Sequence, residues 1–513
     1  MNLERSSGIL LHPTSFPSLD GIGDLGPQAF YWVDFLAAAK CSVWQILPLG
    51  PTGYGDSPYQ SFSAFAGNPY LVSSTILLDE GYLTHEDLTD RPIFPESRID
   101  YGKAIQWKLK ILDRVYENFK NHPGNLESEF IEFKEKNQYW LSDYSLFMAI
   151  KDTQDGHSWL DWPERLRKRD QTELIDFSKK NAELIERHAF RQFLFFRQWL
   201  KLKQYANSKG ITIVGDIPIF VSMDSSDVWS NPDLFYLDSE GHPTVVAGVP
   251  PDYFSPTGQL WGNPLYKWPE HEKTDFDWWV RRIKATLLTA DLIRLDHFRG
   301  FNGYWEVPSG ELTAIKGRWV EGAGSALLKK LKDELGDLPI IAEDLGEITQ
   351  DVVDLRDSFG LPGMKILQFA FSDDARNLFL PHNYIQNCIA YTGTHDNDTA
   401  IGWYQTAPES EKDFARRYLM SNGEDIAWKM VRCVWSSVAV YAIAPLQDIL
   451  QQGPEARMNF PGKAEGNWCY QFKPSDLTPE LAFRIRELNT IFNRIPEINR
   501  IPIQRPIIKY MKP

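Results

Sequence analysis

The sequence is poor in cysteine, with 4 in 513 residues, and no two of them form a C-x-x-C pair. A chain of this size with so few cysteines does not depend on a disulfide framework, and no zinc or redox motif is present. It also lacks an apolar stretch approaching 18 residues, and its first residues have no signal-peptide core. We expect no membrane association and a cytoplasmic location, with a plastid as the alternative if a transit peptide has been removed.

Positive charge is scarce as well: 54 Lys and Arg stand against 69 Asp and Glu, which gives a formal net charge of −15. No basic run offsets that field, so nucleic acid is excluded as a partner. The phosphate-binding G-x-x-x-x-G-K-[ST] and G-x-G-x-x-G motifs and the G-x-S-x-G elbow of serine hydrolases are missing. The His–Asp pairs at 296–297 and 395–396 lack the spacing of H-E-x-x-H. We therefore expect neither a metal nor an organic cofactor.

Aromatic residues are abundant, with 18 Trp, 21 Tyr and 30 Phe making up 13% of the chain. Many will be core residues, because buried aromatics dominate core energetics. A tryptophan excess in an acidic protein also suits carbohydrate binding, since aromatic faces stack on the C–H faces of sugar rings. Composition alone leaves both interpretations open.

Eight short apolar runs, several rich in β-branched residues, end in polar residues, glycine or proline. They cover residues 8–12, 43–47, 211–214, 290–293, 339–342, 364–371, 388–391 and 438–443. Continuous apolar runs of this length are typical of parallel strands buried on both faces. Helical patterns precede several of them, at 182–206, 277–289 and 324–335. The alternation predicts an α/β fold, a (β/α)8 TIM barrel, with functional groups at the C-terminal ends of its strands.

The spacing between the runs is uneven. We expect residues 1–513 to form a single catalytic barrel domain with two large insertions. The first, residues 52–210, lies between strands 2 and 3; it begins as a loop and becomes helical from about residue 101. The second, residues 222–276, follows strand 3. Because long insertions in compact domains are usually functional, we place these mainly helical subdomains at the C-terminal face of the barrel.

Carboxylates follow several of the predicted strands. Arg294 and Asp296 are two residues apart and share a face in an extended chain, so the guanidinium would keep the carboxylate ionised. Glu343 directly follows an apolar strand, where partial desolvation would keep it protonated as a general acid. With Asp396 as a third carboxylate, this set suits a retaining glycosidase. A lone R-x-D is equally typical of a structural ion pair, and Asp216 after the third run could bind sugar or cap a loop.

Several blocks of sequence resemble a known family. The segments at 293–296, 342–346 and 394–396 are similar to the catalytic regions of the α-amylase clan. The segments at 8–18, 55–60, 216–221 and 248–254 resemble its 4-α-glucanotransferase branch, the amylomaltases or disproportionating enzymes of glycoside hydrolase family 77. The resemblance runs from about residue 7 to residue 510, and the blocks follow one another in the order that is typical of the family.

The resemblance implies transfer of α-1,4-glucan segments from a maltooligosaccharide or starch donor to a glucose or glucan acceptor, through a covalent glycosyl-enzyme. Asp296 matches the nucleophile, Glu343 the acid/base and Asp396 the transition-state stabiliser. The residues matching the substrate-binding set are Tyr59, Asp216, Gln259, Trp261, Arg294, His297, His395 and Asn467, with Gln259 and Trp261 on a loop that covers the site.

Other features of the resemblance refine the expectation. The segment after Asp216 departs from the calcium-binding pattern of ordinary α-amylases, which argues against a calcium requirement. About 60 residues follow the last run, which leaves little room for a C-terminal β-sandwich domain. Candidate aromatic platforms, or packing residues of the insertions, are Tyr54, Tyr59, Tyr101, Tyr253, Phe254 and Trp261. The alternatives are an α-1,4-glucan hydrolase and a catalytically silent glucan-binding protein, and the chain would act as a monomer or homodimer.

Overall fold

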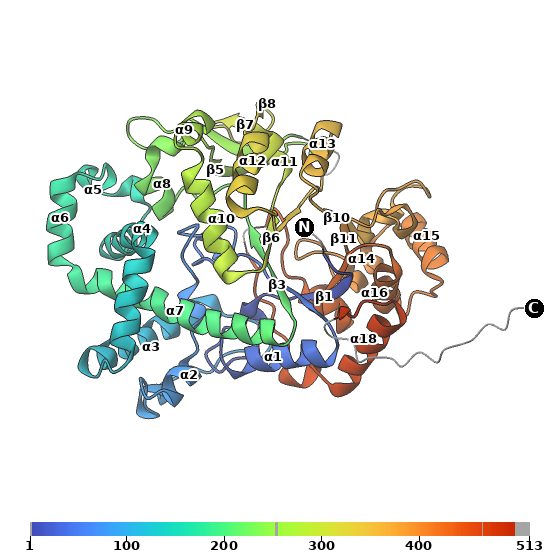
Figure 1. The fold of residues 1–513 in the computed structure, drawn as a ribbon, viewed down its shortest axis with the longest axis horizontal. Coiled ribbons are helices and arrows are strands. Elements are labelled where there is room, and N and C mark those ends of the chain that lie inside the picture. Colours follow the sequence, from blue (N-terminus) through green and yellow to red (C-terminus); the bar gives the residue numbers. More distant parts are fainter. Residues whose placement is uncertain (1–2, 252–254, 464, 498–513) are drawn as a thin grey trace, which may run out of the picture.

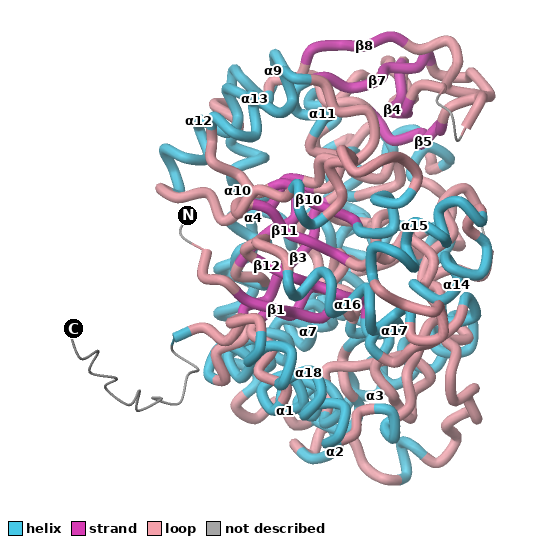
Figure 2. Tube along the Cα trace, turned by 90° about the vertical axis from the view of Figure 1, so that its right-hand side faces the viewer, coloured by secondary structure: helices cyan, strands magenta, loops and turns pink. Residues whose placement is uncertain are grey.

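The computed structural model describes residues 3–251, 255–463 and 465–497. Eight parallel strands form its central sheet in the order β10-β11-β12-β1-β2-β3-β6-β9 (Figure 2). Their bounds are β1 Ser6–Leu10, β2 Val43–Gln45, β3 Thr212–Ile217, β6 Leu292–Leu295, β9 Ile340–Ala342, β10 Gly363–Ile366, β11 Cys388–Tyr391 and β12 Tyr441–Pro445. The backbone N–H of Ala342 donates to the carbonyl oxygen of Pro362 at 2.9 Å and so links the two outermost strands. The predicted TIM barrel is confirmed.

Each of the eight predicted runs contains or overlaps one barrel strand, but some bounds differ. The run at 364–371 is a strand only as far as Ile366 and continues as a 3-10 helix, Leu367–Phe371. The run at 290–293 becomes a strand that begins and ends two residues later, at Leu292 and Leu295, so that Arg294 belongs to the strand itself. Hydrophobicity marks the buried part of a strand, whereas hydrogen bonding to the neighbouring strands decides where it ends.

Helices surround the barrel and cover the outer faces of its strands (Figure 1). These helices are α1 Pro27–Ala38, α7 Ala182–Ser208, α10 Asp277–Thr289, α12 Gly324–Leu335, α13 Gln350–Ser358, α16 Ile426–Ser436 and α18 Pro479–Ile491. The approach is close on β3, where a Cβ added to Gly215 would lie 2.8 Å from the Cβ of Ala290. Glycine at this position lets Ala290, the residue that follows α10, approach the barrel wall closely.

The residues between β2 and β3 are largely helical and end in α7, which also packs on the barrel (Figure 1). Their helices are α2 Ser74–Asp79, α3 Tyr101–Asn121, α4 Leu126–Thr153, α5 Glu164–Arg167 and α6 Gln171–Lys180. The buried ammonium of Lys108 on α3 contacts Asp20 at 2.9 Å and Asp24 at 3.5 Å. This ion-pair cluster ties the helical subdomain to the loop that follows β1.

A four-stranded antiparallel sheet lies at one end of the molecule, in the order β5-β4-β7-β8 (Figure 2). Its strands are β4 Val245–Val249, β5 Gln259–Pro264, β7 Gly303–Pro308 and β8 Arg318–Glu321. The sequence analysis did not predict this sheet. Its strands come from two separate stretches, after β3 and after β6, and Gly and Pro interrupt their hydrophobic pattern. Pairing between distant segments therefore stabilises strands that local sequence does not indicate.

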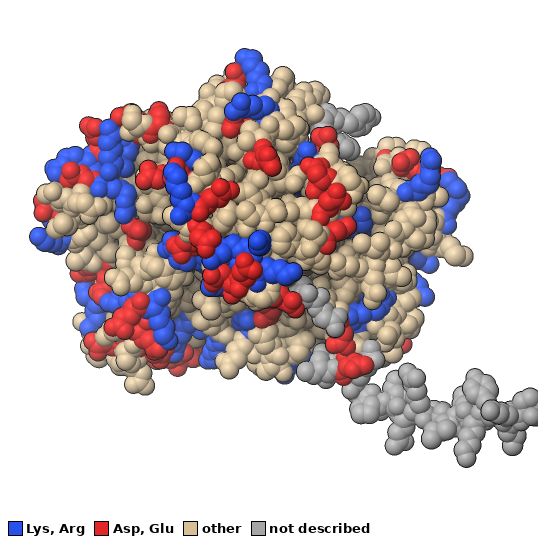
Figure 3. Space-filling model, turned by 45° about the horizontal axis from the view of Figure 1, so that its top comes forward, with Lys and Arg blue, Asp and Glu red and all other residues tan. Residues whose placement is uncertain are grey.

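The remaining helices are short or lie toward the C-terminus: α8 Ser226–Ser230, α9 Trp268–Lys273, α11 Arg299–Asn302, α14 Ala400–Thr406, α15 Glu409–Leu419 and α17 Leu446–Ile449. Over the part of the chain that the structure describes, no helix combines the length and apolar character needed to cross a membrane. Acidic and basic side chains are interspersed on the face shown in Figure 3.

Candidate active site

Four carboxylates lie at or just beyond the C-terminal ends of barrel strands. Asp216 is the penultimate residue of β3, Asp296 follows β6, Glu343 follows β9 and Asp396 lies five residues beyond the end of β11. Parallel strands in a closed barrel end at the same rim, so residues far apart in sequence come together there. The side chains of Asp296 and Asp396 are 28% and 45% exposed, whereas that of Asp216 is fully buried. Solvent therefore reaches Asp296 and Asp396 but not Asp216.

Arg294 connects two of these carboxylates. Its side chain is 4% exposed; Nη1 donates to Asp216 Oδ2 at 2.7 Å, and Nη2 lies 2.8 Å from Asp296 Oδ1. Burial lowers the pKa of Arg294, but the two carboxylates outweigh burial and raise it above its ordinary value. Tyr59 completes the group by donating its hydroxyl to Asp216 Oδ2 at 2.8 Å. The guanidinium thus stays charged and holds Asp296 in one orientation.

Glu343 is held by two backbone N–H groups. That of His297 donates to Oε2 at 2.6 Å, and that of Leu345 donates to Oε1 at 3.1 Å. Burial raises the pKa of Glu343 to about 8; Arg294 opposes this rise, and the negative charge of Asp296 adds to it. Glu343 is therefore protonated at neutral pH, as a general acid must be before it acts.

The backbone at His297 is unusual for a non-glycine residue, with φ of 52°. This left-handed conformation turns the chain sharply after Asp296 and accompanies the hydrogen bond from its N–H to Glu343. Backbone strain of this kind often occurs at active sites. The imidazole packs edge-on against Trp261, with ring centroids 4.8 Å apart, and burial lowers its pKa to about 4. A neutral imidazole can both donate and accept a hydrogen bond.

Asp396 lies among polar and aromatic side chains. Asn459 donates its amide Nδ2 to Asp396 Oδ1 at 2.7 Å, and His395 Nε2 lies 3.4 Å from Oδ2. The His395 ring stacks on Tyr59 with centroids 5.3 Å apart and also packs against Trp468. Tyr59 therefore contacts both the Asp216 and the Asp396 sides of the site.

Comparison with known proteins shows the family of the chain. The sequence profile described as 4-alpha-glucanotransferase matches residues 11–478. The chain belongs to the 4-alpha-glucanotransferase family. Its activity is accordingly that of a glycosyltransferase acting on glucans.

The similarity extends over nearly the whole chain. The 4-alpha-glucanotransferase of Thermus thermophilus is 50% identical, with 96% of this chain and 100% of the relative covered. The enzyme of Synechocystis sp. is 49% identical over 96% of this chain and 98% of its own length. A solved amylomaltase from Streptococcus agalactiae, in complex with acarbose, is 39% identical with a TM-score of 0.93, covering 96% of this chain and 100% of that one.

In this glucanotransferase Gln259 and Trp261 lie on β5, where sequence analysis placed a loop. Antiparallel pairing with β4, Gly248 opposite Leu260 and Val249 opposite Gln259, gives the segment its extended form. The indole N–H of Trp261 donates to Gln259 Oε1 at 3.2 Å. The contact of Trp261 with His297 brings this strand to the carboxylate site, and a sheet therefore presents Gln259 and Trp261.

The side-chain amide of Asn467 forms its hydrogen bonds within its own loop. Its Oδ1 accepts from the backbone N–H of Phe460 at 2.9 Å, and its Nδ2 donates to the carbonyl oxygen of Lys463 at 2.8 Å. The neighbouring Trp468, with φ of 62°, directs its ring against Tyr59 and His395. The expected approach of this segment to the site is made by Trp468, and Asn467 shapes the loop that carries it.

The aromatic residues considered as sugar platforms include both packing residues and residues at the site. Tyr101 is buried and donates its hydroxyl to the carbonyl oxygen of Trp468 at 2.9 Å, which is a packing contact. Tyr59 contacts Asp216 and His395, and Trp261 contacts His297. Tyr253 and Phe254, and the side chain of Tyr54, lie outside the described part of the structure.

Sequence reasoning missed Arg457 and Asn459. Arg457 Nη2 donates to the backbone carbonyl of Asp396 at 2.7 Å, and Asn459 binds the carboxylate of the same residue. Both lie in an irregular segment after β12 that carries no strand or helix pattern. Only the folded chain brings this segment, some 60 residues later in the sequence, against the end of β11.

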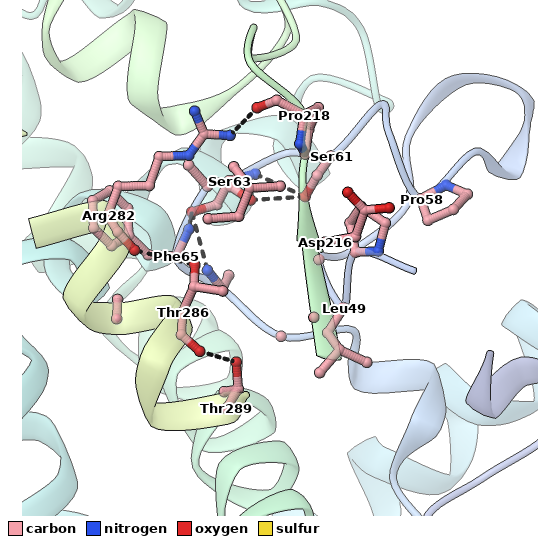
Figure 4. A pocket seen from close by; sticks show the side chains of 18 of the residues that line it. Leu49, Pro58, Ser61, Ser63, Phe65, Asp216, Pro218, Arg282, Thr286 and Thr289 are labelled. Atoms are coloured by element: carbon pink, nitrogen blue, oxygen red, sulfur yellow. Dashed lines mark hydrogen bonds between the residues drawn. The ribbon is translucent and has the colours of Figure 1, made fainter. Parts of the chain in front are cut away.

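A cavity of about 80 Å³ adjoins β3 next to the site. Figure 4 shows Thr286, Thr289 and Arg282 of α10 on one side of the strand, while Asp216 and Pro58 lie on the other. Because successive side chains of a strand point to opposite faces, Gly215 faces this cavity and Asp216 faces the barrel mouth. Tyr59 and Asp216 also line the cavity, so it borders the carboxylate site as well as the helices outside β3.

Proposed function

We propose that this enzyme transfers α-1,4-glucan segments from a maltooligosaccharide or starch donor to a glucose or glucan acceptor by a retaining double displacement. Asp296 is the nucleophile and Glu343 the acid/base. The observation that carries the proposal is their difference in environment: Arg294 holds Asp296 in a semi-exposed position, while Glu343 is buried with a pKa raised to about 8. Two carboxyl groups in such different environments are typical of glycosidic bond cleavage.

In the first step Asp296 Oδ attacks the anomeric carbon of the donor, the glycosidic C–O bond breaks, and the Glu343 proton passes to the leaving oxygen. In the second step an acceptor hydroxyl attacks the same carbon, Asp296 leaves, and Glu343 takes the hydroxyl proton. The negative charge of Asp296 contributes to the raised pKa of Glu343. Because that charge disappears in the covalent ester, the pKa of Glu343 falls when the residue must act as a base.

Asp396 stabilises the oxocarbenium-like transition state with its negative charge. Its carboxylate is the most exposed of the group, and its hydrogen-bond donor is the neutral amide of Asn459. A neutral donor fixes orientation and leaves the full charge for the substrate. We propose that Tyr59, Gln259, Trp261, His297 and His395 line the donor-sugar site. Asp216, Arg294 and Asn467 would support it from buried positions through the hydrogen bonds described above.

Solvent reaches Asp296 and Asp396 in the free site, so we attribute a preference for transfer over hydrolysis to the exclusion of water by a bound glucan. Within the insertion at 222–276, β5 brings Trp261 against His297 and thus forms one wall of the site. A covered site favours a bound sugar acceptor over water in the second step. With maltotriose as sole substrate we expect glucose and longer oligomers; glucose and maltose alone would indicate hydrolysis and refute the assignment.

The nucleophile is tested with Asp296→Asn, which keeps size and removes the charge. We expect transfer to fall by at least about 10⁴-fold, since removing a nucleophile leaves only binding and electrostatic contributions. The exposed Asp373→Asn is the matched control and should keep wild-type rates. An Asp296→Asn enzyme that still transfers glucan at the wild-type rate would overturn the assignment.

Further expectations concern acarbose binding, cellular location, oligomeric state and cofactors. The Streptococcus agalactiae amylomaltase has been solved with acarbose, and we expect this enzyme to bind acarbose and to lose that binding when Trp261 is truncated. We propose that it works in the cytoplasm as a monomer or homodimer, without a metal or organic cofactor, and without nucleic acid or membrane partners. Transfer rates unchanged by EDTA would support the metal-free proposal, and a loss restored by calcium would refute it.

A further inference from the structure

Residues 457–459 wrap around the end of β11 and hold His395 and Asp396 by their backbone. The N–H of Asn459 donates to the carbonyl oxygen of His395 at 3.1 Å, and Arg457 Nη2 donates to that of Asp396 at 2.7 Å. The segment is itself anchored, since the N–H of Trp468 donates to the carbonyl oxygen of Met458 at 2.8 Å. Two consecutive carbonyl groups of the catalytic loop are therefore fixed by one irregular segment.

The side chain of Asn459 then orients the carboxylate. Its Nδ2 lies 2.7 Å from Asp396 Oδ1, a short distance that is typical of a strong hydrogen bond to a charged acceptor. The other oxygen, Oδ2, has His395 Nε2 at 3.4 Å, and burial lowers the pKa of that imidazole, which keeps the ring neutral. Asn459 thus makes the shortest side-chain contact to Asp396.

The nearby positive charge, that of Arg457, contacts groups other than the Asp396 carboxylate. The Arg457 guanidinium donates Nε to the carbonyl oxygen of Asn459 at 2.7 Å, lies over the Phe460 ring at 4.3 Å, and has Asp398 at 3.8 Å. It contacts the backbone of Asp396 and not the carboxylate. An arginine on the carboxylate itself would neutralise the charge that faces the substrate, whereas an amide fixes the geometry without doing so.

We propose that Asn459 is a positioning residue for Asp396: its amide holds the carboxylate in the plane that meets the transition state, and Arg457 holds the segment that carries Asn459. This inference rests on the role given above to Asp396. Catalytic groups must be held within a fraction of an ångström of their productive position, so a lost orienting bond lowers turnover more than substrate binding.

The test compares two variants of the same residue. Asn459→Ala removes the donor, and we expect kcat to fall by about 10- to 100-fold, as for loss of a hydrogen bond to a charged group, with KM changed by less than about threefold. Asn459→Asp keeps the shape of the side chain but places a second carboxylate against that of Asp396. The two carboxylates can be accommodated when they share one proton. The kcat of Asn459→Asp should be low at pH 8 and recover toward pH 5, unlike that of Asn459→Ala. The exposed Asn422→Ala is the control and should match the wild type.

Asp396→Asn separates this inference from the proposed function. If Asp396→Asn keeps wild-type kcat, the assigned role of Asp396 fails and the inference fails with it. If Asp396→Asn loses turnover while folded Asn459→Ala keeps wild-type kcat, only the positioning role of Asn459 is refuted. We expect the double variant Asp396→Asn/Asn459→Ala to be no slower than Asp396→Asn alone; fully additive losses would also overturn the inference. Should Asn459→Ala fold poorly, the pH profile of Asn459→Asp decides: a profile parallel to that of the wild type refutes the role.

Discussion

The buried carboxyl of Glu343 should make the enzyme less stable as the pH rises. The pKa of Glu343 is about 8 in the folded chain against an ordinary value of 4.5, because burial disfavours its charged form. The folded state therefore binds this proton more tightly than the unfolded state. Its contribution to stability is complete below about pH 4.5 and is lost as the pH rises toward 8, at about 1.4 kcal/mol per pH unit. At pH 8 the loss is on the order of 4 kcal/mol.

Glu343→Gln removes this titration. Glutamine offers a single carbonyl oxygen, so one of the N–H donors, that of His297 or of Leu345, loses its acceptor at a cost of about 1–3 kcal/mol that is the same at every pH. The stability of the variant relative to the wild type should therefore increase steadily from pH 5 to pH 8. Transfer activity should be lost throughout, because the amide has no proton to give.

The assay is urea denaturation of the wild type, Glu343→Gln and the exposed Glu321→Gln on β8, at half-unit intervals from pH 5 to pH 9. We expect the free-energy difference between Glu343→Gln and the wild type to change by about 3–4 kcal/mol across this range. The Glu321→Gln difference should stay within about 0.5 kcal/mol. A difference for Glu343→Gln that does not vary with pH would refute the claim that burial keeps this carboxyl protonated.

Three further changes probe separate contacts. Gly363→Ala would place a Cβ 2.3 Å from Asp344 Oδ2 at the junction of β9 and β10, and we expect urea denaturation to show about 1–3 kcal/mol of destabilisation. An unchanged free energy of unfolding would refute this packing argument. Lys108→Met leaves Asp20 without its ammonium partner at 2.9 Å and should cost about 3–5 kcal/mol in the same assay; a loss below about 1 kcal/mol would refute it. Trp261→Ala should lower kcat/KM for transfer by about 10-fold and raise the hydrolysed share of product measured by chromatography, and an unchanged product ratio would argue against water exclusion by this ring.

The candidate catalytic carboxylates could be located from sequence because strand ends are local features. Glu343 directly follows an apolar strand and Arg294 lies two residues before Asp296, so the buried acid and the ion pair were both predicted from neighbouring residues. Parallel strands share one rim once a barrel is assumed. Asp396 was found in the same way, from its position after β11.

The supporting contacts could not be located from sequence. Asn459 lies 63 residues from Asp396, and the two meet through one hydrogen bond between irregular segments. The antiparallel sheet pairs β4 with both β5 and β7, although the barrel strand β6 lies between β5 and β7 in the sequence. Neither arrangement has a periodic signal, since each depends on pairing between segments far apart in the chain.

By itself, the sequence determined the eight barrel strands, the acidic rim and the chemical type of each candidate catalytic group, because hydrophobic runs and strand-end polarity are encoded within a few residues. Tertiary structure alone decided the left-handed turn at His297, the sheet that presents Trp261 and the orientation of Asp396 by Asn459. It also set how far the predicted burial of Glu343 raises the pKa of that residue. Desolvation and orientation are properties of the packed surroundings. They arise only when distant segments exclude water together and fix one another in place.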